Sequence, residues 1–236
     1  MGMSGHSKWS TIKHKKAAND AVKGSVFTKM AKAITIAVKK GGGVGDPEMN
    51  FSLRLAVDKA RSVNMPKENI DRAIDKGLGK GGVELSELLI EVFAPEGVVA
   101  ILEVVSDSRN RTVAELRTLI EKYGGRMGEI GSAMYLFDHC GIIHTTAKIS
   151  EEIQLALIDL GMSDLVIDES GTTVYTTVET MHAVIKYLKQ QGIEAGGMIG
   201  YRPKTTVELK DSTKVENFLE ILSEYEDVQE IYANLG

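Results

Sequence analysis

The spacing of apolar residues changes near residue 80, and this change does most to limit what the chain can fold into. Before residue 77, apolar residues recur every three or four positions, as on the buried face of an α-helix. After residue 87, short runs of Leu, Ile, Val and Phe alternate with further helical stretches, which is typical of strands interleaved with helices. The glycine-rich segment 77–82 separates the two patterns and is typical of a linker. We therefore predict a helical domain followed by α+β structure.

Capping and breaking residues set the expected ends of the helices in the first part. A helix over 25–40 has apolar residues on one face and lysines on the other, and it should end at the glycines 41–43. Asp46 and Pro47 predict the start of a second helix, with aspartate as N-cap and proline in the first turn. Pro66 gives the same signal, so a third helix is expected over about 66–76.

A first sheet is expected after the glycine-rich segment. The runs 88–93 and 98–105 predict a hairpin around the turn 94–97. A helix over 112–123 and a strand over 133–137 should follow. These elements are too few to cover both faces of their own sheet, so this unit needs a further part of the chain to complete it.

A second unit begins near residue 141 and has the order strand, helix, strand, strand, helix, strand, which is the ferredoxin-like motif. The tail then predicts a strand at 206–209, a helix at 215–225 and a strand at 228–232. We infer that the tail completes the first sheet and that the second unit is an insertion. The expected fold is α+β and multidomain, with a basic helical domain over 1–82, an α+β domain over 83–138 plus 204–236, and an inserted ferredoxin-like domain over 139–203.

Charge is divided unevenly between the two parts of the chain. The net charge is −5, but residues 1–82 contain 16 Lys or Arg against 7 Asp or Glu, a balance of +9. Residues 83–236 contain 12 against 26, a balance of −14. Such a split indicates a polyanionic partner for the basic part, because phosphate is attracted to the first domain and repelled by the rest.

Basic residues cluster most densely near the N-terminus, where Trp9 lies among them. Lysines release counterions from a nucleic acid, while an aromatic ring can stack on a base. The alternative is a solvated basic helix end with Trp9 docked into the helical bundle. The residues expected to contact nucleic acid are His6, Lys8, Trp9, Lys13, His14, Lys15, Lys16, Lys23, Lys29 and Lys32. Arg109 and Arg111 are a possible secondary contact with phosphate or an acidic partner, although a capping role explains this segment as well.

Motifs for other functions fail on their context. Residues 77–82 match the dinucleotide-binding pattern G-x-G-x-x-G, but that site needs a strand before it and a helix after it, and here the order is reversed. His139, Cys140 and His144 lack a fourth zinc ligand, and neighbours on a strand should point to opposite faces. No nucleophile elbow, triad spacing or catalytic pair of carboxylates stands out. We predict a non-enzymatic protein with no cofactor and no metal.

The chain shows no apolar run of the length that a membrane span requires and no secretory signal pattern, so no membrane partner is expected. Its one cysteine, Cys140, agrees with a reducing compartment. We expect the protein to be cytoplasmic.

Eight short motifs are spread over nearly the whole chain. They are Gly5-His6-Ser7-Lys8-Trp9, Ile12-Lys13-His14, Phe27-Thr28-Lys29, Asp46-Pro47, Asn64-Met65-Pro66, Arg72-Ala73-Ile74, Asn110-Arg111-Thr112 and Gly131-Ser132. Together they resemble the YebC family, also called the YebC/PmpR family. The chain departs from the family pattern at Val44-Gly45, which lengthens a glycine loop, and at Glu96, which adds an acid to the turn after Pro95.

The resemblance implies three domains, with the third inserted into the second, in agreement with the order of elements. It also implies a cytoplasmic DNA-binding transcriptional regulator, with some relatives linked to translation. Two hypotheses follow: a DNA-binding transcriptional regulator, or a translation factor whose same basic surface binds ribosomal RNA on the ribosome. Charge does not separate them, because A-form and B-form backbones both attract lysine. The acidic domains are expected to contact a protein partner or a second copy of the chain.

Overall fold

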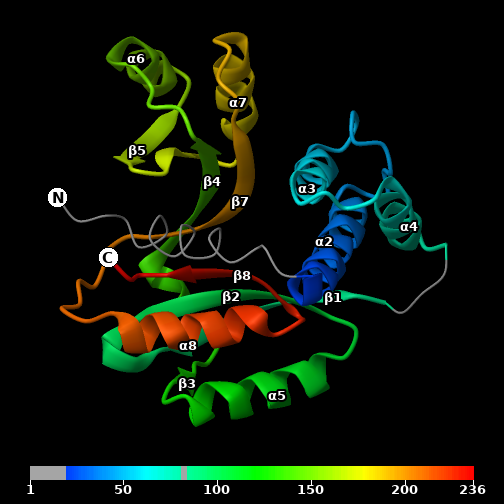
Figure 1. Cartoon of the computed structure of the whole chain (residues 1–236), viewed down its shortest axis with the longest axis vertical. Coiled ribbons are helices and arrows are strands. Elements are labelled where there is room, and N and C mark those ends of the chain that lie inside the picture. The colour runs from blue at the N-terminus through cyan, green and yellow to red at the C-terminus, as the bar shows by residue number, and fades with distance from the viewer. Residues whose placement is uncertain (1–19, 81–83) are drawn as a thin grey trace.

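The computed structural model of the chain describes residues 20–80 and 84–236, with side chains described from residue 24 onward. In the first domain these residues form the helices α2 (Asp20–Lys40), α3 (Phe51–Ser62) and α4 (Lys67–Gly77). Helices α3 and α4 both pack against α2 and share one apolar core with it (Figure 1). The predicted helical first domain is confirmed.

The second helix of this domain begins later than the sequence predicted. The prediction from Asp46 is wrong because residues 46–49 form a turn, and α3 begins at Phe51. Asn50 is the N-cap: its side-chain oxygen accepts from the backbone N–H of Leu53 at 3.1 Å, and its amide nitrogen donates to two backbone carbonyls at 3.0 Å. This buried side chain joins the glycine loop to the helix start, and so it outweighs the Asp-Pro signal.

The second domain is an antiparallel sheet with helices on one face (Figure 1). Strands β1 (Ser86–Phe93) and β2 (Val99–Ser106) form the predicted hairpin, with the short helix η1 (Pro95–Gly97) between them. In the described residues the strand order is β3-β1-β2-β8, where β3 is Arg126–Met127 and β8 is Val228–Ala233. The covering helices are α5 (Arg109–Lys122) and α8 (Thr213–Glu224).

The third domain has the predicted ferredoxin-like order. Its elements are β4 (Phe137–Thr145), α6 (Glu151–Asp159), β5 (Met162–Asp168), β6 (Gly171–Thr176), α7 (Met181–Gln190) and β7 (Gly196–Pro203). The strand order is β5-β6-β4-β7 with antiparallel neighbours, which places the two halves of the split βαβ motif in one sheet.

The tail returns to the first sheet, so the third domain is an insertion in the second. Strand β8 pairs with β2, and α8 packs its apolar face into the core that β1, β2 and α5 share. The inserted domain starts and ends at neighbouring points, since Phe137 and Pro203 are partners in the ladder of β4 and β7. The residue boundaries at 82, 138 and 203 stay predictions; β4 runs across the one at 138.

Two of the predicted strands are wrong. Residues 133–137 instead contain the short helix η2 (Met134–Leu136), because the Glu91 carboxylate accepts the backbone N–H groups of Gly131, Ala133 and Met134 and removes them from any strand ladder. Gly131 has a φ of +85°, which explains the glycine at this position. The segment 206–209 forms only an isolated bridge, from Val207 to Leu235.

Candidate functional site

Most of the predicted nucleic-acid contacts lie outside the described residues. These are His6, Lys8, Trp9, Lys13, His14, Lys15 and Lys16. Lys23 lies in α2, but its side chain is also outside the description. The structure therefore gives the surroundings of Lys29, Lys32, Arg109 and Arg111.

The lysine face of α2 meets the second domain rather than open solvent. Lys29 Nζ donates to the backbone carbonyl of Ser223 at the end of α8. Lys32 Nζ lies 2.5 Å from Asp227 Oδ1 and 3.4 Å from Glu226 Oε1, in the turn before β8. The helical period correctly predicted which face of α2 is polar. Both amines are engaged by the second domain in this structure, and their contact with phosphate stays a prediction.

Three further lysines of the first domain reach across the same boundary. Lys40 Nζ lies 2.8 Å from Glu87 Oε1 on β1, and Lys59 on α3 pairs with Glu230 on β8. Lys39 Nζ donates to the Leu85 carbonyl at 3.4 Å. We name the lysine side of this contact the lysine row: Lys29, Lys32, Lys39, Lys40 and Lys59. We name its carboxylates the docking acids: Glu87, Glu226, Asp227 and Glu230.

Asp227 is the most buried of the docking acids. Its Oδ1 accepts from Lys32, while its Oδ2 accepts from the Thr112 hydroxyl at 2.5 Å on the first turn of α5. Ser106, at the end of β2, extends the network at 2.6 Å from Thr112. Burial alone would raise the pKa of the Asp227 carboxyl, but the hydrogen bonds from Lys32 and Thr112 outweigh it and hold that pKa below its usual range. Asp227 therefore stays charged at neutral pH and joins both domains.

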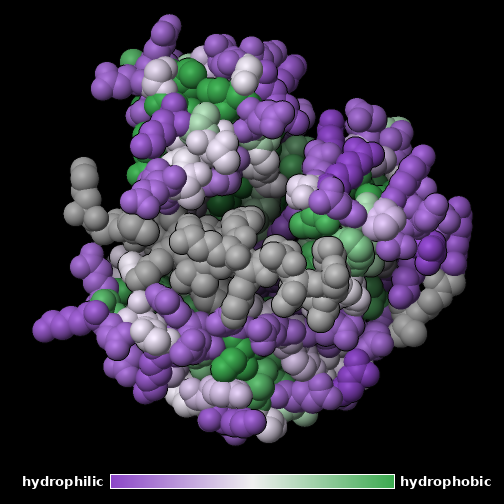
Figure 2. Space-filling model, in the orientation of Figure 1, coloured by the Kyte–Doolittle hydropathy of each residue, from purple (hydrophilic) through white to green (hydrophobic). Residues whose placement is uncertain are grey.

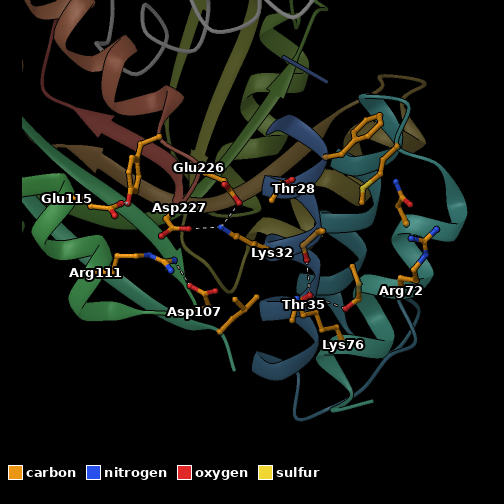
Figure 3. Close-up of a pocket in the computed structure, with 17 residues that line it drawn as sticks. Thr28, Lys32, Thr35, Arg72, Lys76, Asp107, Arg111, Glu115, Glu226 and Asp227 are labelled. Carbon is orange, nitrogen blue, oxygen red and sulfur yellow. Dashed lines mark hydrogen bonds and ion pairs between the residues drawn. The ribbon is translucent and has the colours of Figure 1, made fainter. Parts of the chain in front are cut away.

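A groove of about 680 Å³ lies where these elements meet (Figure 3). Helices α2 and α4 form one wall, from which Lys32 extends toward Asp227 and Glu226. The start of α5 and the turn before β8 form the other wall. Positive and negative side chains both line the groove, so its chemistry is that of a polar contact between domains rather than of an anion pocket.

Helix α5 begins earlier than predicted, at Arg109, and Ser108 occupies its N-cap position. Arg109 and Arg111 are thus exposed residues of the first helical turn. Arg111 Nη2 lies 2.6 Å from Asp107 Oδ1 and lines the groove, while Arg109 does not line it. The structure brings Arg111 near Lys32 in the groove, but each has its own acidic partner.

Asp227 was not among the predicted site residues, although the sequence carries a signal for its partner. Thr112 lies one turn before the core residue Leu116 on the apolar face of α5. A hydroxyl on the core face of a helix indicates a buried hydrogen bond. The sequence does not show which residue accepts the Thr112 hydrogen bond, because that residue, Asp227, is 115 positions away.

The candidate metal ligands of β4 do not converge in the structure. His139 is exposed and Cys140 buried, which confirms that they point to opposite faces of β4. Burial raises the pKa of the Cys140 thiol to about 11, so it is uncharged at neutral pH. No described group of three or more His, Cys, Asp and Glu side chains converges as metal ligands do. No helix in 20–80 or 84–236 has the length and apolar character to cross a bilayer.

Glu103 lies on β2 beside the docking acids and is largely buried. Burial is the main cause that raises the pKa of its carboxyl to about 7, and the neighbouring Glu230 adds to the effect. Lys40 and a hydrogen bond from the Tyr232 hydroxyl at 3.2 Å oppose it. The folded protein therefore holds a proton on Glu103 at a pH where the unfolded chain has lost it.

This raised pKa predicts a stability that falls as pH rises. The folded state binds the proton more tightly, so the stabilising contribution of Glu103 is full below about pH 4.5 and is lost progressively as pH rises through about 7. We expect Glu103→Gln to abolish this loss of stability with rising pH. A pKa shift of this size corresponds to a loss on the order of 3 kcal/mol. Urea unfolding at several pH values measures it, with the exposed Glu129→Gln as control. Parallel pH profiles for Glu103→Gln and the wild type would refute the assignment.

These elements define a class of three-domain α+β protein, with a helical first domain and a ferredoxin-like third domain inserted in the second. Residues 7–80 match the family model described as the TACO1/YebC protein N-terminal domain, and residues 85–235 match the TACO1/YebC second and third domain. The chain belongs to the TACO1/YebC family, as its motifs predicted.

Full-length relatives agree with this assignment. The chain is 42% identical over 238 residues to a "probable transcriptional regulatory protein" of Thermotoga petrophila, covering 98% of this chain and 93% of that one. A protein of the same name from Chloroflexus aggregans is 42% identical over 241 residues, covering 99% and 95%. The crystal structure of a conserved hypothetical protein from Aquifex aeolicus is similar with a TM-score of 0.83 at 36% identity, covering 92% and 91%. The relatives' names indicate a regulatory protein rather than an enzyme.

Proposed function

We propose that the protein is a DNA-binding transcriptional regulator that contacts backbone phosphate through its basic N-terminal domain. The observation that carries this proposal is the charge division, +9 over residues 1–82 and −14 over residues 83–236. Phosphate is steered to the first domain by such a field. The names of the relatives support the regulatory part of the proposal.

Exposed basic residues of α4 add support. Figure 2 shows mainly hydrophilic residues over the first domain, at the right of the view. Lys67, Arg72 and Lys76 are exposed on α4, and none of them forms an ion pair with another described residue. Arg72 and Lys76 are four positions apart and so share one side of the helix. Arg72 and Lys76 line the groove, and both side chains stay exposed while the lysine row is engaged.

Sequence preference should be weak. The predicted contacts are mostly lysines, which bind phosphate, whereas Arg, Asn and Gln most often read base edges. The acidic second and third domains are expected to serve protein contacts or self-association, since a net charge of −14 opposes their contact with nucleic acid.

Binding of the full chain to duplex DNA and to an RNA hairpin of equal length tests the proposal. We expect duplex binding that weakens steeply with salt and differs only a few-fold between unrelated sequences. Fluorescence anisotropy at several salt concentrations measures both. A strong preference for the hairpin would favour the ribosomal RNA alternative, and binding to neither at low salt would overturn the proposal.

A further inference from the structure

We propose that the docking acids are an internal competitor for nucleic acid: they pair with Lys32, Lys40 and Lys59 of the lysine row, and full contact of this row with phosphate requires the first domain to leave the second. This inference rests on the proposed function and adds a regulatory contact to it. The acidic second domain would then set how much of the basic surface is open to a polyanion.

The contact is extended rather than a single pair. Lysines from both α2 and α3 reach acceptors on β1, on β8 and at the end of α8. Four carboxylates thus face one lysine-bearing side of the helical domain. A row of carboxylates offers these amines the same charge-assisted hydrogen bonds that phosphate oxygens offer.

Docking and phosphate binding exclude each other at the centre of this contact. The side chain of Lys32 is 15% exposed and that of Asp227 is 7% exposed. The Lys32 amine already has its acidic partner at 2.5 Å and is covered by the second domain. A phosphate group must therefore displace Asp227 to bind the Lys32 amine, so the docked contact and phosphate binding compete at this residue.

Opening of the first domain has to break polar pairs with the second domain and the apolar contact of Phe51 and Leu55 with the core of the third domain. Lys40 and Glu87 are 61% and 40% exposed, and pairs of this kind contribute little and are screened by salt. The apolar part between the first and second domains includes the small buried cluster of Ile36, Leu85 and Val105. Small polar interfaces between domains permit relative motion. A duplex carries a far denser row of charges than the second domain and can replace it.

Neutralising three of the four docking acids tests this competition in the full chain. The docking variant carries Glu87→Gln, Glu226→Gln and Glu230→Gln, and keeps Asp227 because that residue also holds Thr112. We expect it to bind duplex DNA about fivefold to tenfold more tightly, since a larger fraction of molecules is then open for binding.

A matched variant controls for the change in net charge. It carries Glu121→Gln, Glu129→Gln and Glu169→Gln, all exposed residues of the second and third domains. None of the three forms an ion pair with a described residue of the first domain. We expect this control to bind within about twofold of the wild type, because distant surface charges are screened.

A distance measurement tests the motion itself. Spin labels at Asp71→Cys and Glu121→Cys, both exposed positions, in a Cys140→Ser background, report the separation of the first and second domains. We expect a longer distance between the labels in the docking variant without DNA. In the labelled protein that keeps all four docking acids, we expect the longer distance once duplex DNA saturates the protein. The labels lie outside the lysine row and the docking acids.

The outcomes separate this inference from the proposed function. Equal affinities for the docking variant and its control, or a distance unchanged at saturating duplex, would overturn the competition while leaving DNA binding intact. If wild type and both variants all fail to bind duplex DNA, the proposed function fails and the competition fails with it.

Discussion

A chain that ends at Pro203 is expected to lose the fold of its second domain. The truncation removes β8, the ladder partner of β2, and α8, which buries Val215, Phe218, Leu219 and Leu222 in the core. Loss of one large buried apolar side chain costs about 2 to 5 kcal/mol, so several together exceed the typical total stability of a domain. Thermal unfolding followed by circular dichroism should show no cooperative transition for the second domain.

Deletion of the inserted third domain is the control. Removing residues 138–202 joins Phe137 to Pro203, which are ladder partners on neighbouring strands, so a short Gly-Ser linker closes the gap. We expect a folded but less stable protein, because Ile101 and Tyr232 lose the third-domain side chains that pack against them. If the truncated chain melts cooperatively and the internal deletion does not, the tail does not complete the second domain as we infer.

The order of the elements was predictable because most of them carry local signals. In the third domain most helices and strands have a hydrophobic period and lie between turn residues, while the glycine-containing β7 was predicted only as a strand near Ile199. The strand neighbours in this sheet are all antiparallel. The insertion was predicted from the number of elements in the first unit, because these were too few to cover its sheet. Local patterns and a packing rule were thus enough for the architecture.

The errors arose where a distant group decides the local structure. Glu91 takes the N–H groups of a segment about 40 positions away, so an apolar run that favours a strand becomes a loop and a short helix. Asn50 binds carbonyls on the far side of the glycine loop, and this moves the helix start past Asp46. Neither partnership leaves a signal at the position that it changes.

At the candidate site, too, the partners of the lysine row are distant in sequence and leave no local signal. Helical period shows which face of α2 is polar but not whether that face meets solvent, phosphate or another domain. The partner of Lys32 lies 195 positions away, on a turn whose acids have no distinctive pattern. The basic character of the domain was predictable, whereas the occupant of its lysines required the structure.

Replacing Lys13, Lys15 and Lys16 with Ala is expected to cause a large loss of nucleic-acid affinity. If all three contact phosphate, the loss on duplex DNA at 0.1 M salt is on the order of a hundredfold or more, and it should be the same for every sequence. Filter binding to unrelated duplexes checks this. The control replaces three exposed lysines of the third domain with Ala, Lys148, Lys186 and Lys189, and should lose little affinity.

Contact between the N-terminal lysines and backbone phosphate should appear in the salt dependence of duplex binding. The measurement is the slope of log affinity against log salt for the full chain and for the triple variant at positions 13, 15 and 16. We expect the slope of the variant to be flatter by roughly 0.9 for each lysine that contacts phosphate, with no change in the third-domain control. An unchanged slope in the triple variant would contradict phosphate contact by these lysines.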